Sequence, residues 1–425
     1  MMKNRNKRVL IHSLIYSPDG VSTAYLYRDI ALALKEAGMD VSVLTTTPHY
    51  NAVKEELEKQ PIKWKVFPLL KKSEHDGIRV THIPMKKFKS TILRLLSFIH
   101  WHIISFSTAL FMKKQDIIIS PSPPLTIGML NVWLGKLKGA KVVYNVQEVY
   151  PDILGLKEGR VFDILSKMER FVYDNSSVVT TIDDVFYNNI SNRFKDPSKL
   201  KIIPNFVDTE LYRPLNSSEH PNLDRHLFVR NDHLKLLYAG NVGMAQDWDT
   251  LIELARKTKD LKIDFYVIGE GVKLDYLKDR VAHYNLEKVR ILPYQPRNLM
   301  PEIIAFSDIQ FIFMEPQIAA QGFPSKVYTI MACGKPLLVC SPEDSPIVKF
   351  LRPIGCAKLV TETEMDAKTE DMKRWLKEIL EPQNLLPDGG NIILREMGEK
   401  GLKEIEGNYS KDVVTRKYAD LLSHL

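Results

Sequence analysis

The residues that could most clearly take part in chemistry lie at 321–339. Their pattern predicts a loop, a short helix and a buried strand. Gly322 and Pro324 favour a turn, and Ser325 is of the type that caps the free amides of a helix's first turn. Lys326 then puts a cation where the helix dipole favours an anion. Because such conflicts are typical of functional sites, the pattern predicts a phosphate site formed by the helix N-terminus and Lys326. The plain alternative is a solvated lysine on an ordinary surface helix.

A second set of chemically useful residues follows the apolar strand expected at 142–146. Glu148 and Asp152 come just after it, and the carboxyl end of a parallel strand is where such sheets bind ligands. We therefore expect an acid or base at this position. The alternative is that one of the two carboxylates only caps the next helix.

Length and composition limit the class of protein. The chain of 425 residues is too long for one hydrophobic core and predicts two domains. Its 44% hydrophobic and 26% charged residues are those of an ordinary globular protein. Cys333, Cys340 and Cys356 have neither paired nor metal-ligand spacing, which indicates a reducing compartment. Residues 9–15 are too short and too polar for the core of a signal peptide, so we expect a cytoplasmic protein.

The positive charge is confined to the first part of the chain. Residues 1–116 hold 19 Lys and Arg against 10 Asp and Glu, whereas the remainder holds 40 against 42. This imbalance predicts an anionic partner for the first part alone, either nucleic acid or an anionic membrane. Nucleic acid is disfavoured because the charges alternate with a long apolar segment and form no aromatic-studded groove.

That apolar segment covers residues 92–112 and has lysines on both sides. It is long enough to cross a bilayer, but Arg94, His100, His102 and several hydroxyl groups argue against a transmembrane helix. We expect a helix lying in the interface of an anionic membrane, over residues 86–114. The alternative is a helix packed within the first domain, with lysines that only solvate its ends.

The same strand–helix–strand pattern occurs in both halves of the chain. It covers residues 9–15, 23–37 and 41–45 and again 234–239, 248–257 and 263–268. Further strands and helices predict an α/β protein of two doubly wound, Rossmann-like domains facing a central cleft. The first domain is expected at 1–208 with 409–425 packing back on it, and the second at 209–408, beginning with a linker at 209–233. Residues 50–82 are polar and predict irregular structure.

Five segments in order resemble the retaining nucleotide-sugar glycosyltransferases of family 4, which have the GT-B fold. They are Tyr16-Ser17-Pro18-x-Gly20, Ile203-Pro204-Asn205-x-Val207-Asp208, Tyr238-Ala239-Gly240-Asn241-Val242-Gly243, Val267-Ile268-Gly269-Glu270-Gly271 and Phe323-Pro324-Ser325-Lys326-Val327-Tyr328-x-Ile330-Met331-Ala332-x-Gly334-Lys335-Pro336. The resemblance covers most of the chain. It is greatest to the branch that builds bacterial surface polysaccharides, such as O-antigen or capsule, from N-acetylfucosamine or other N-acetylhexosamines.

The resemblance implies a role for residues in both domains. Lys326 would stabilise the leaving diphosphate, and Glu148 would activate or orient the acceptor hydroxyl. Gly20, His49 and Asp152 would lie on the acceptor side. The residues expected to bind the donor are Gly240, Asn241, Val242, Gly243, Gln246, Gly269, Glu270, Gln321, Gly322, Phe323, Pro324, Ser325 and Thr329.

The sequence also departs from the family pattern. Gln321 and Thr329 stand where much of the family has two donor-binding glutamates, and Asn241 and Gln246 stand at the usual Arg and Lys. A histidine common after the strand in the first domain is replaced here by a Gln147–Glu148 pair. Lys326, the helix terminus and the amides of residues 240–243 would then form the phosphate cradle.

The resulting hypothesis is sugar transfer, with retention, from a UDP-sugar to an undecaprenyl-diphosphate-linked acceptor at the inner face of the plasma membrane. No metal or other cofactor is expected, because Lys326 and backbone amides would stabilise the leaving diphosphate. The first turn carries a single glycine, Gly20, which disfavours a nicotinamide enzyme. Two alternatives stay open: an enzyme like the hydrolysing UDP-N-acetylglucosamine 2-epimerases, and a catalytically inactive GT-B scaffold.

Overall fold

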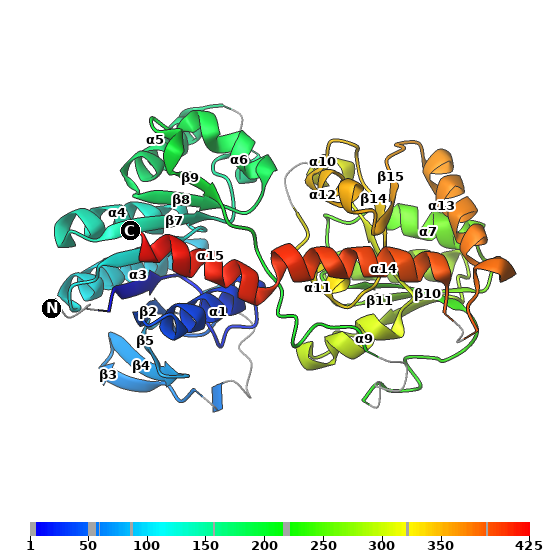
Figure 1. The fold of residues 1–425 in the computed structure, drawn as a ribbon, viewed down its shortest axis with the longest axis horizontal. Coiled ribbons are helices and arrows are strands. Elements are labelled where there is room, and N and C mark those ends of the chain that lie inside the picture. Colours follow the sequence, from blue (N-terminus) through cyan, green and yellow to red (C-terminus); the bar gives the residue numbers. More distant parts are fainter. Residues whose placement is uncertain are drawn as a thin grey trace. The chain divides into compact units, whose positions relative to one another are not determined.

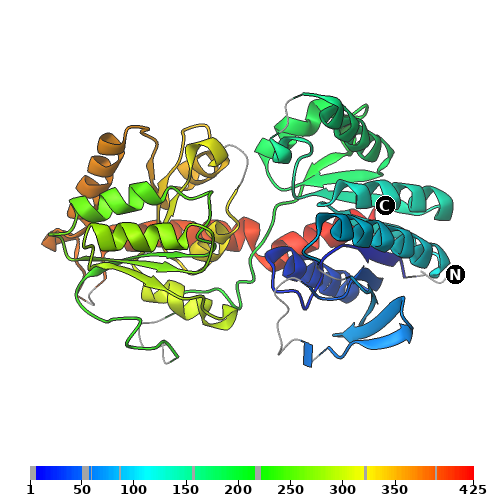
Figure 2. The same cartoon turned by 180° about the vertical axis from the view of Figure 1, so that it is seen from behind.

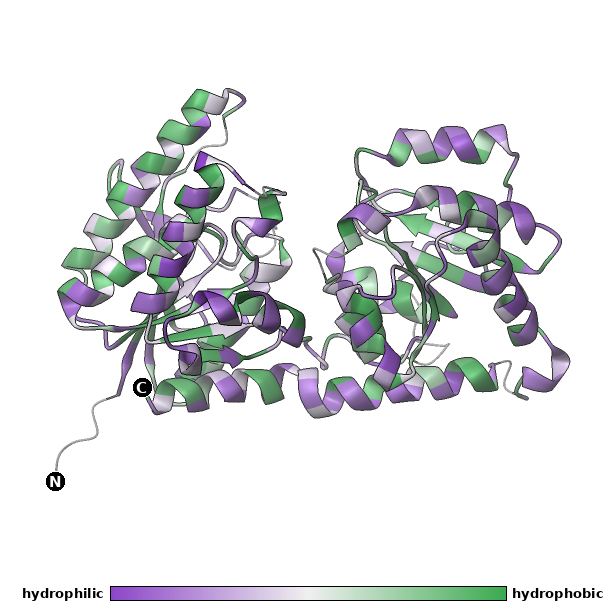
Figure 3. Cartoon of the chain, turned by 90° about the horizontal axis from the view of Figure 1, so that it is seen from above, coloured by the Kyte–Doolittle hydropathy of each residue, from purple (hydrophilic) through white to green (hydrophobic). Residues whose placement is uncertain are grey.

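The chain forms two compact units. The computed structural model describes residues 6–49, 57–58, 60–85, 88–155, 158–215, 222–319, 323–387 and 390–425. Unit 1 comprises Met1–Phe206 with Lys411–Leu425, and unit 2 comprises Val207–Ser410. These limits lie close to the boundaries expected from the sequence. Figure 3 shows hydrophobic strands inside each unit and helices on which hydrophobic and hydrophilic residues alternate.

Unit 1 is built on a nine-stranded sheet with the order β3-β4-β5-β2-β1-β6-β7-β8-β9. Its strands are β1 (Arg8–His12), β2 (Asp40–Thr46), β3 (Lys63–Val66), β4 (Leu70–His75), β5 (Ile78–Ile83), β6 (Ile117–Pro121), β7 (Lys141–Val146), β8 (Val178–Thr181) and β9 (Leu200–Ile202). All neighbours from β5 to β9 pair in parallel. Every residue of β6 is buried, which is typical of a parallel strand covered on both faces.

Helices cover both faces of this sheet. The α-helices of unit 1 are α1 (Ser22–Glu36), α3 (Thr91–Phe111), α4 (Leu125–Lys138), α5 (Arg160–Asn175), α6 (Asp184–Ile190) and α15 (Lys411–Ser423). Helices α1 and α15 pack together on one face (Figure 1), and α3, α4 and α5 pack in that order on the other (Figure 2). Tyr418 of α15 accepts a hydrogen bond from the buried Asn145 (3.1 Å), so the end of the chain belongs to the core of unit 1, as expected.

The prediction of irregular structure at 50–82 is wrong for the described part of that range. β3 and β4 form an antiparallel hairpin, and β4 continues antiparallel onto β5. The turn into β5 places Asp76 and Gly77 at positive φ, the conformation of a tight two-residue hairpin turn. All four residues of β3 are exposed, so this strand has no buried face, although its lysines alternate with Trp64 and Val66.

Helix α3 has two different faces. Trp101, Ser105 and Ala109, four residues apart, are buried against the domain. The opposite face exposes a group of large apolar side chains, namely Ile92, Leu93, Leu95, Leu96, Ile99, Ile103, Leu110 and Phe111. By length and composition α3 could also span a membrane, although its buried face makes it part of the folded domain. The alternative of a helix packed within the first domain is confirmed for the buried face, and the membrane contact of the exposed face stays a prediction.

Unit 2 is a six-stranded, fully parallel sheet with the order β12-β11-β10-β13-β14-β15. The strands are β10 (Leu234–Ala239), β11 (Ile263–Ile268), β12 (Val289–Leu292), β13 (Ile309–Phe313), β14 (Leu337–Cys340) and β15 (Ala357–Val360). The α-helices are α7 (Trp248–Lys257), α8 (Leu274–His283), α9 (Met300–Phe306), α10 (Pro316–Ala319), α11 (Lys326–Ala332), α12 (Pro346–Ile354), α13 (Met365–Ile379) and α14 (Ile392–Glu404). This confirms a doubly wound second domain.

The predicted linker at 209–233 is wrong in part. Leu223 and Phe228 are buried in an apolar cluster with Tyr266 of β11, so this stretch contributes to the core of unit 2. Because Leu223 and Phe228 stand alone among polar residues, the sequence pattern does not indicate that they are buried. Residues 216–221 of the same stretch lie outside the described residues.

Candidate active site

Lys326 lies where two loops of unit 2 meet. Its Nζ donates a hydrogen bond to the carbonyl oxygen of Ala239 (3.0 Å) and lies 3.7 Å from the centre of the Tyr238 ring. Neither contact carries a formal negative charge. Burial of the ammonium lowers the pKa of Lys326 to about 7, because no acid compensates for the lost hydration. The site thus holds a cation that an anionic ligand would stabilise.

Two glycines make this arrangement possible. Gly240 (φ 150°) follows β10, and a Cβ added to it would lie 2.5 Å from Nζ of Lys326. Gly269 (φ 143°) follows β11, and its added Cβ would lie 1.9 Å from the carbonyl oxygen of Gly240. Side chains at either position would therefore drive the loops apart. The structure brings together Gly240, Gly269 and Lys326, as the sequence predicts.

Three of the four amides expected in the phosphate cradle are already engaged in this structure. The N–H of Gly240 donates to Ile268 O (2.9 Å), and that of Val242 donates to Glu270 O (2.8 Å). The N–H of Gly243 donates to the side chain of Gln246 (3.3 Å). These bonds join the loop to its neighbours, and they correct the prediction of free amides for Gly240, Val242 and Gly243.

The capping role predicted for Ser325 is also wrong. Ser325 has helical backbone angles and its side chain makes no capping hydrogen bond to α11. The N–H of Val327 donates to Pro324 O (3.0 Å), and that of Tyr328 donates to Ser325 O (3.3 Å), so the first turn satisfies two of its own amides. Lys326, rather than the terminus of this short helix, therefore has to supply the positive charge.

The other residues around α11 have different surroundings. Gln321 and Gly322 lie outside the described residues. Phe323 packs against Tyr328 and Phe350, with ring centres 5.3 and 5.0 Å away. Thr329 donates its hydroxyl hydrogen to Lys326 O (2.8 Å), which leaves its lone pairs for a ligand.

The polar residues of the 240–246 loop support the loop itself. The side chain of Asn241 lies against Gly243 and Gly271, where an added Cβ would meet it at 2.5 and 2.6 Å. Gln246 holds the Gly243 amide, as described above. Glu270 is exposed on the neighbouring loop. In this structure, therefore, Asn241 and Gln246 hold the loop closed.

In unit 1, the loops after β1 and β2 meet at the carboxyl edge of the sheet. The N–H of His49 donates to the carboxylate of Asp19 (2.9 Å), the residue before Gly20. The His49 ring lies within hydrogen-bond distance of Thr46 Oγ1 (3.1 Å) and Thr47 O (3.0 Å). Gly20 and His49 are thus neighbours, as the acceptor-side prediction requires.

Glu148 follows β7 at the same edge and is half-buried. Burial raises the pKa of its carboxyl group, and a hydrogen bond from Tyr150 partly opposes that rise. Its neighbour Gln147 is held by a reciprocal pair of hydrogen bonds with Asn205 (3.0 and 2.9 Å). A carboxyl group with a raised pKa on a fixed strand end suits proton transfer.

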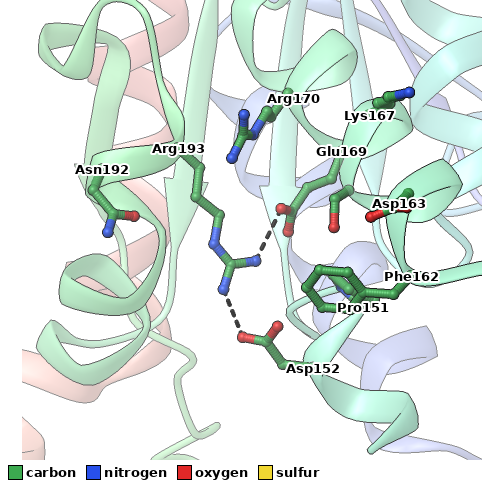
Figure 4. A pocket seen from close by; sticks show the side chains of 10 residues that line it. Pro151, Asp152, Phe162, Asp163, Lys167, Glu169, Arg170, Asn192 and Arg193 are labelled. Carbon is green, nitrogen blue, oxygen red and sulfur yellow. Dashed lines mark hydrogen bonds and ion pairs between the residues drawn. The ribbon is translucent and has the colours of Figure 1, made fainter. Parts of the chain in front are cut away.

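Asp152 belongs to a cavity of about 400 Å³ beside this loop. Arg193 joins Asp152 (2.6 Å), Glu169 (2.9 Å) and the carbonyl of Tyr150 (2.9 Å) (Figure 4). The cavity wall consists of Pro151, Asp152, Phe162, Asp163, Ser166, Lys167, Glu169, Arg170, Asn192 and Arg193. No sequence pattern indicates Arg193, because the two carboxylates that it contacts are 24 and 41 residues away.

The described residues contain no group of three or more His, Cys, Asp and Glu side chains that could hold a metal ion. The metal-free reaction stays a prediction that chelation can test.

The comparisons with known proteins agree with this geometry. Residues 22–205 match the model of the glycosyl transferase 4-like domain, and residues 220–385 match that of glycosyl transferases group 1. A putative colanic acid biosynthesis glycosyl transferase, WcaI of Escherichia coli K12, is 23% identical over 93% of this chain and 96% of its own. The alpha-galactosylglucosyldiacylglycerol synthase of Streptococcus pneumoniae is 24% identical over 76% of this chain and 75% of its own.

Solved structures show the same fold. Anabaena HepE, in complex with UDP and glucose, has a TM-score of 0.70 at 14% identity, with 99% of this chain and all of its own covered. The two domain models and the fold together define a glycosyltransferase of the GT-B class. The chain belongs to family 4 of these enzymes, since the two matched domains follow each other in its sequence.

Proposed function

We propose that the protein transfers a sugar, with retention, from a UDP-sugar to a lipid-linked saccharide in O-antigen or capsule synthesis. The sugar is an N-acetylated hexosamine or deoxyhexosamine, as the sequence resemblance implies. The observation that carries the proposal is Lys326, whose buried ammonium has no acid partner among the described residues and lies beside the Gly240 turn. Three similar proteins support this proposal. WcaI is named for colanic acid biosynthesis, which supports polysaccharide synthesis, and the alpha-galactosylglucosyldiacylglycerol synthase supports a lipid acceptor. The complex of HepE with UDP supports a UDP donor.

In this proposal, Lys326 binds the diphosphate of the donor and neutralises the charge that develops as the sugar leaves. A preplaced ammonium in a site of low polarity gives this stabilisation without reorganisation at the moment of reaction. Gly240 and Gly269 let the nucleotide approach the backbone, and the hydroxyl oxygen of Thr329 can accept a hydrogen bond from the ribose.

On the acceptor side, Glu148 accepts or orients the proton of the attacking hydroxyl. Its raised pKa supports this role, because a base close to the working pH is more efficient than an ordinary surface carboxylate. The carboxylate–amide–arginine lining of the neighbouring cavity, with Phe162 and Pro151 beside it, suits the hydroxyl groups and apolar faces of a sugar. We therefore assign this cavity to the saccharide of the acceptor.

The decisive experiment is a screen of UDP-sugars with the full chain and a short-chain polyprenyl-diphosphate saccharide, read by mass spectrometry. A mass gain of one sugar on the acceptor, unchanged by a chelator, is expected. Conversion of the nucleotide sugar without an acceptor would instead indicate the epimerase. Absence of UDP binding in calorimetry would indicate an inactive scaffold.

A further inference from the structure

The β3–β4 hairpin lies at the edge of the sheet of unit 1 (Figure 1). It exposes aromatic and apolar side chains. Trp64 is 45% exposed, and Phe67 in the turn is 76% exposed. The two rings pack edge to face, 4.9 Å apart, so they form one apolar unit on the surface. Val66 and Leu69 extend it, at 47% and 38% exposed. Contiguous exposed apolar side chains of this kind indicate an interaction surface, whereas apolar residues scattered singly over a surface do not.

Lysines surround this apolar unit. Residues 63–72 contain Lys63, Lys65, Lys71 and Lys72 and no acidic residue. Lys71 Nζ lies 4.4 Å from the centre of the Trp64 ring, so the ammonium and the ring form a cation–π contact. Aromatic rings with lysines around them match the acyl boundary and the phosphates of an anionic bilayer.

The strand register places this turn at the carboxyl edge of the sheet. Lys71 pairs with His82 near the end of β5, whereas His75 pairs with Ile78 at its beginning. The β3–β4 turn therefore lies beyond the end of β5, at the edge that also carries the Gly20 and His49 loops.

The exposed face of α3 begins at the same edge, since α3 follows β5 in the chain. Leu70 of the hairpin packs in the same apolar cluster as Trp101 and Ile104 of α3, so hairpin and helix form one rigid surface. The charge agrees with this arrangement, because residues 77–147 hold ten Lys and Arg and one acid, Asp116.

We propose that the β3–β4 hairpin is a membrane anchor of its own, in which Trp64 and Phe67 enter the interface of an anionic bilayer. The hairpin and the exposed face of α3 then give unit 1 two contacts with the bilayer. Two contacts fix the orientation of unit 1 on the membrane, whereas α3 alone would allow unit 1 to rotate about the helix axis. The acceptor edge of the sheet is then held at the headgroups. This last consequence rests on the proposed function, whereas the membrane contact does not.

The alternative occupant of an open edge strand is a second copy of the chain. Lys63 and Lys65 disfavour it, because lysines on an edge strand oppose strand pairing between molecules. Association in solution that is lost with the hairpin's aromatic residues, without lipid binding, would overturn the proposal.

The test is flotation of the full chain with vesicles of phosphatidylcholine, with or without phosphatidylglycerol. The double variant Trp64→Ser, Phe67→Ser is expected to bind phosphatidylglycerol vesicles about tenfold more weakly than the natural chain. Lys63→Glu with Lys65→Glu is expected to weaken binding mainly at low salt. The matched control is Val272→Ser, at an 80% exposed site in unit 2, which should bind as the natural chain does. Equal binding by the double variant and this control would overturn the proposal.

A second measurement leaves the hairpin intact. The chain has five tryptophans, of which Trp101, Trp248 and Trp375 are at most 9% exposed. Replacing the exposed Trp133 by Phe therefore leaves Trp64 as the one largely exposed indole. Its fluorescence should be quenched by lipids brominated near the headgroup end of the acyl chain, and no quenching in bound protein would contradict insertion. Transfer to a detergent-dispersed acceptor should survive Trp64→Ser, Phe67→Ser, which separates this proposal from that of sugar transfer.

Discussion

Lys326 owes its proposed role to what surrounds it. Its ammonium contacts a carbonyl oxygen and a ring, and both are weaker partners than a carboxylate. The charged form of Lys326 is therefore destabilised while the site is empty. A bound diphosphate would stabilise that charged form. Such a residue contributes to function at a cost to folding.

Replacing Lys326 with Ala should lower turnover by ~10²-fold or more, because the developing phosphate charge loses its counter-ion. Steady-state kinetics with the UDP-sugar identified in the screen measures this effect. Lys349→Ala, at an exposed position of α12, is the control and should retain normal turnover. Lys326→Met should lose activity but unfold at a higher temperature than the natural chain at neutral pH. Near-normal turnover of Lys326→Ala would remove the assigned role.

The pH dependence of UDP binding should follow the same lysine. Its pKa of about 7 means that the empty site is mostly neutral above that pH, so binding must then include uptake of a proton. The affinity for UDP should fall as the pH rises from about 7 to about 9, by up to about tenfold per unit. Calorimetry in buffers of different ionisation enthalpy measures the proton uptake. An affinity that is flat over this range would contradict the lowered pKa.

The stability of the free protein should have the opposite pH dependence. Because the pKa of Lys326 is lower in the folded chain than in the unfolded one, the unfolded state binds more protons between the two values. This lysine's contribution therefore makes the protein more stable as the pH rises through that window. The contribution should vanish in Lys326→Met.

At this scale the sequence predicted residue types better than their contacts. The conflict between Lys326 and the helix dipole identified the cation. Three of the four amides expected beside it, those of Gly240, Val242 and Gly243, already donate hydrogen bonds to neighbouring atoms. Arg193 could not have been predicted, since only the folded chain brings Asp152 and Glu169 to it.

At the scale of elements, the Gly240 and Gly269 turns hold the two donor loops in contact. Gly269→Ala should destabilise unit 2 by about 1–3 kcal/mol and weaken UDP binding, because its Cβ would overlap the backbone of Gly240. Gly407→Ala is the control, since no atom lies within 4 Å of its added Cβ. Chemical denaturation and calorimetry together measure both effects, and equal behaviour of the two variants would contradict the tight approach.

The cavity at the start of α5 should govern the acceptor rather than the donor. Arg170→Ala or Asn192→Ala should raise the KM for the lipid-linked saccharide about tenfold, the loss expected for one hydrogen bond or two. The KM for the UDP-sugar should stay unchanged. Arg160→Ala, exposed on the same helix outside the cavity wall, serves as the control. A change confined to the donor KM would place the acceptor elsewhere.

Most elements were predictable because both sheets are buried on two faces and their strands read as continuous apolar runs. The hairpin at 63–75 could not be predicted for the opposite reason, since in β3 lysines alternate with Trp64 and Val66 and all four residues are exposed. The partly buried segment at 209–233 was taken for a linker because Leu223 and Phe228 are isolated apolar residues among polar ones.

At the scale of the molecule, the end of the chain returns to complete the first unit. Val414, Tyr418 and Leu422 of α15 are buried in the same cluster as Ile11 of β1. Leu422→Ala should destabilise unit 1 by about 2–5 kcal/mol through the cavity it leaves. Hydrogen exchange should then quicken in β1 and β6 and stay unchanged in β10 and β11. Lys417→Ala, exposed on α15, should change neither.

Residues 22–205 and 220–385 belong to two glycosyltransferase domain models, and each coincides with most of one structural unit. Each unit thus has its own core, its own sheet and its own set of loops at the carboxyl edge. We propose donor chemistry for unit 2, and acceptor and membrane contacts for unit 1.

A crystal structure of the protein with UDP tests the central claim most directly. The account predicts that Nζ of Lys326 leaves the carbonyl of Ala239 and lies within hydrogen-bond distance of a phosphate oxygen. UDP bound elsewhere, or bound here with Lys326 still on Ala239, would contradict it.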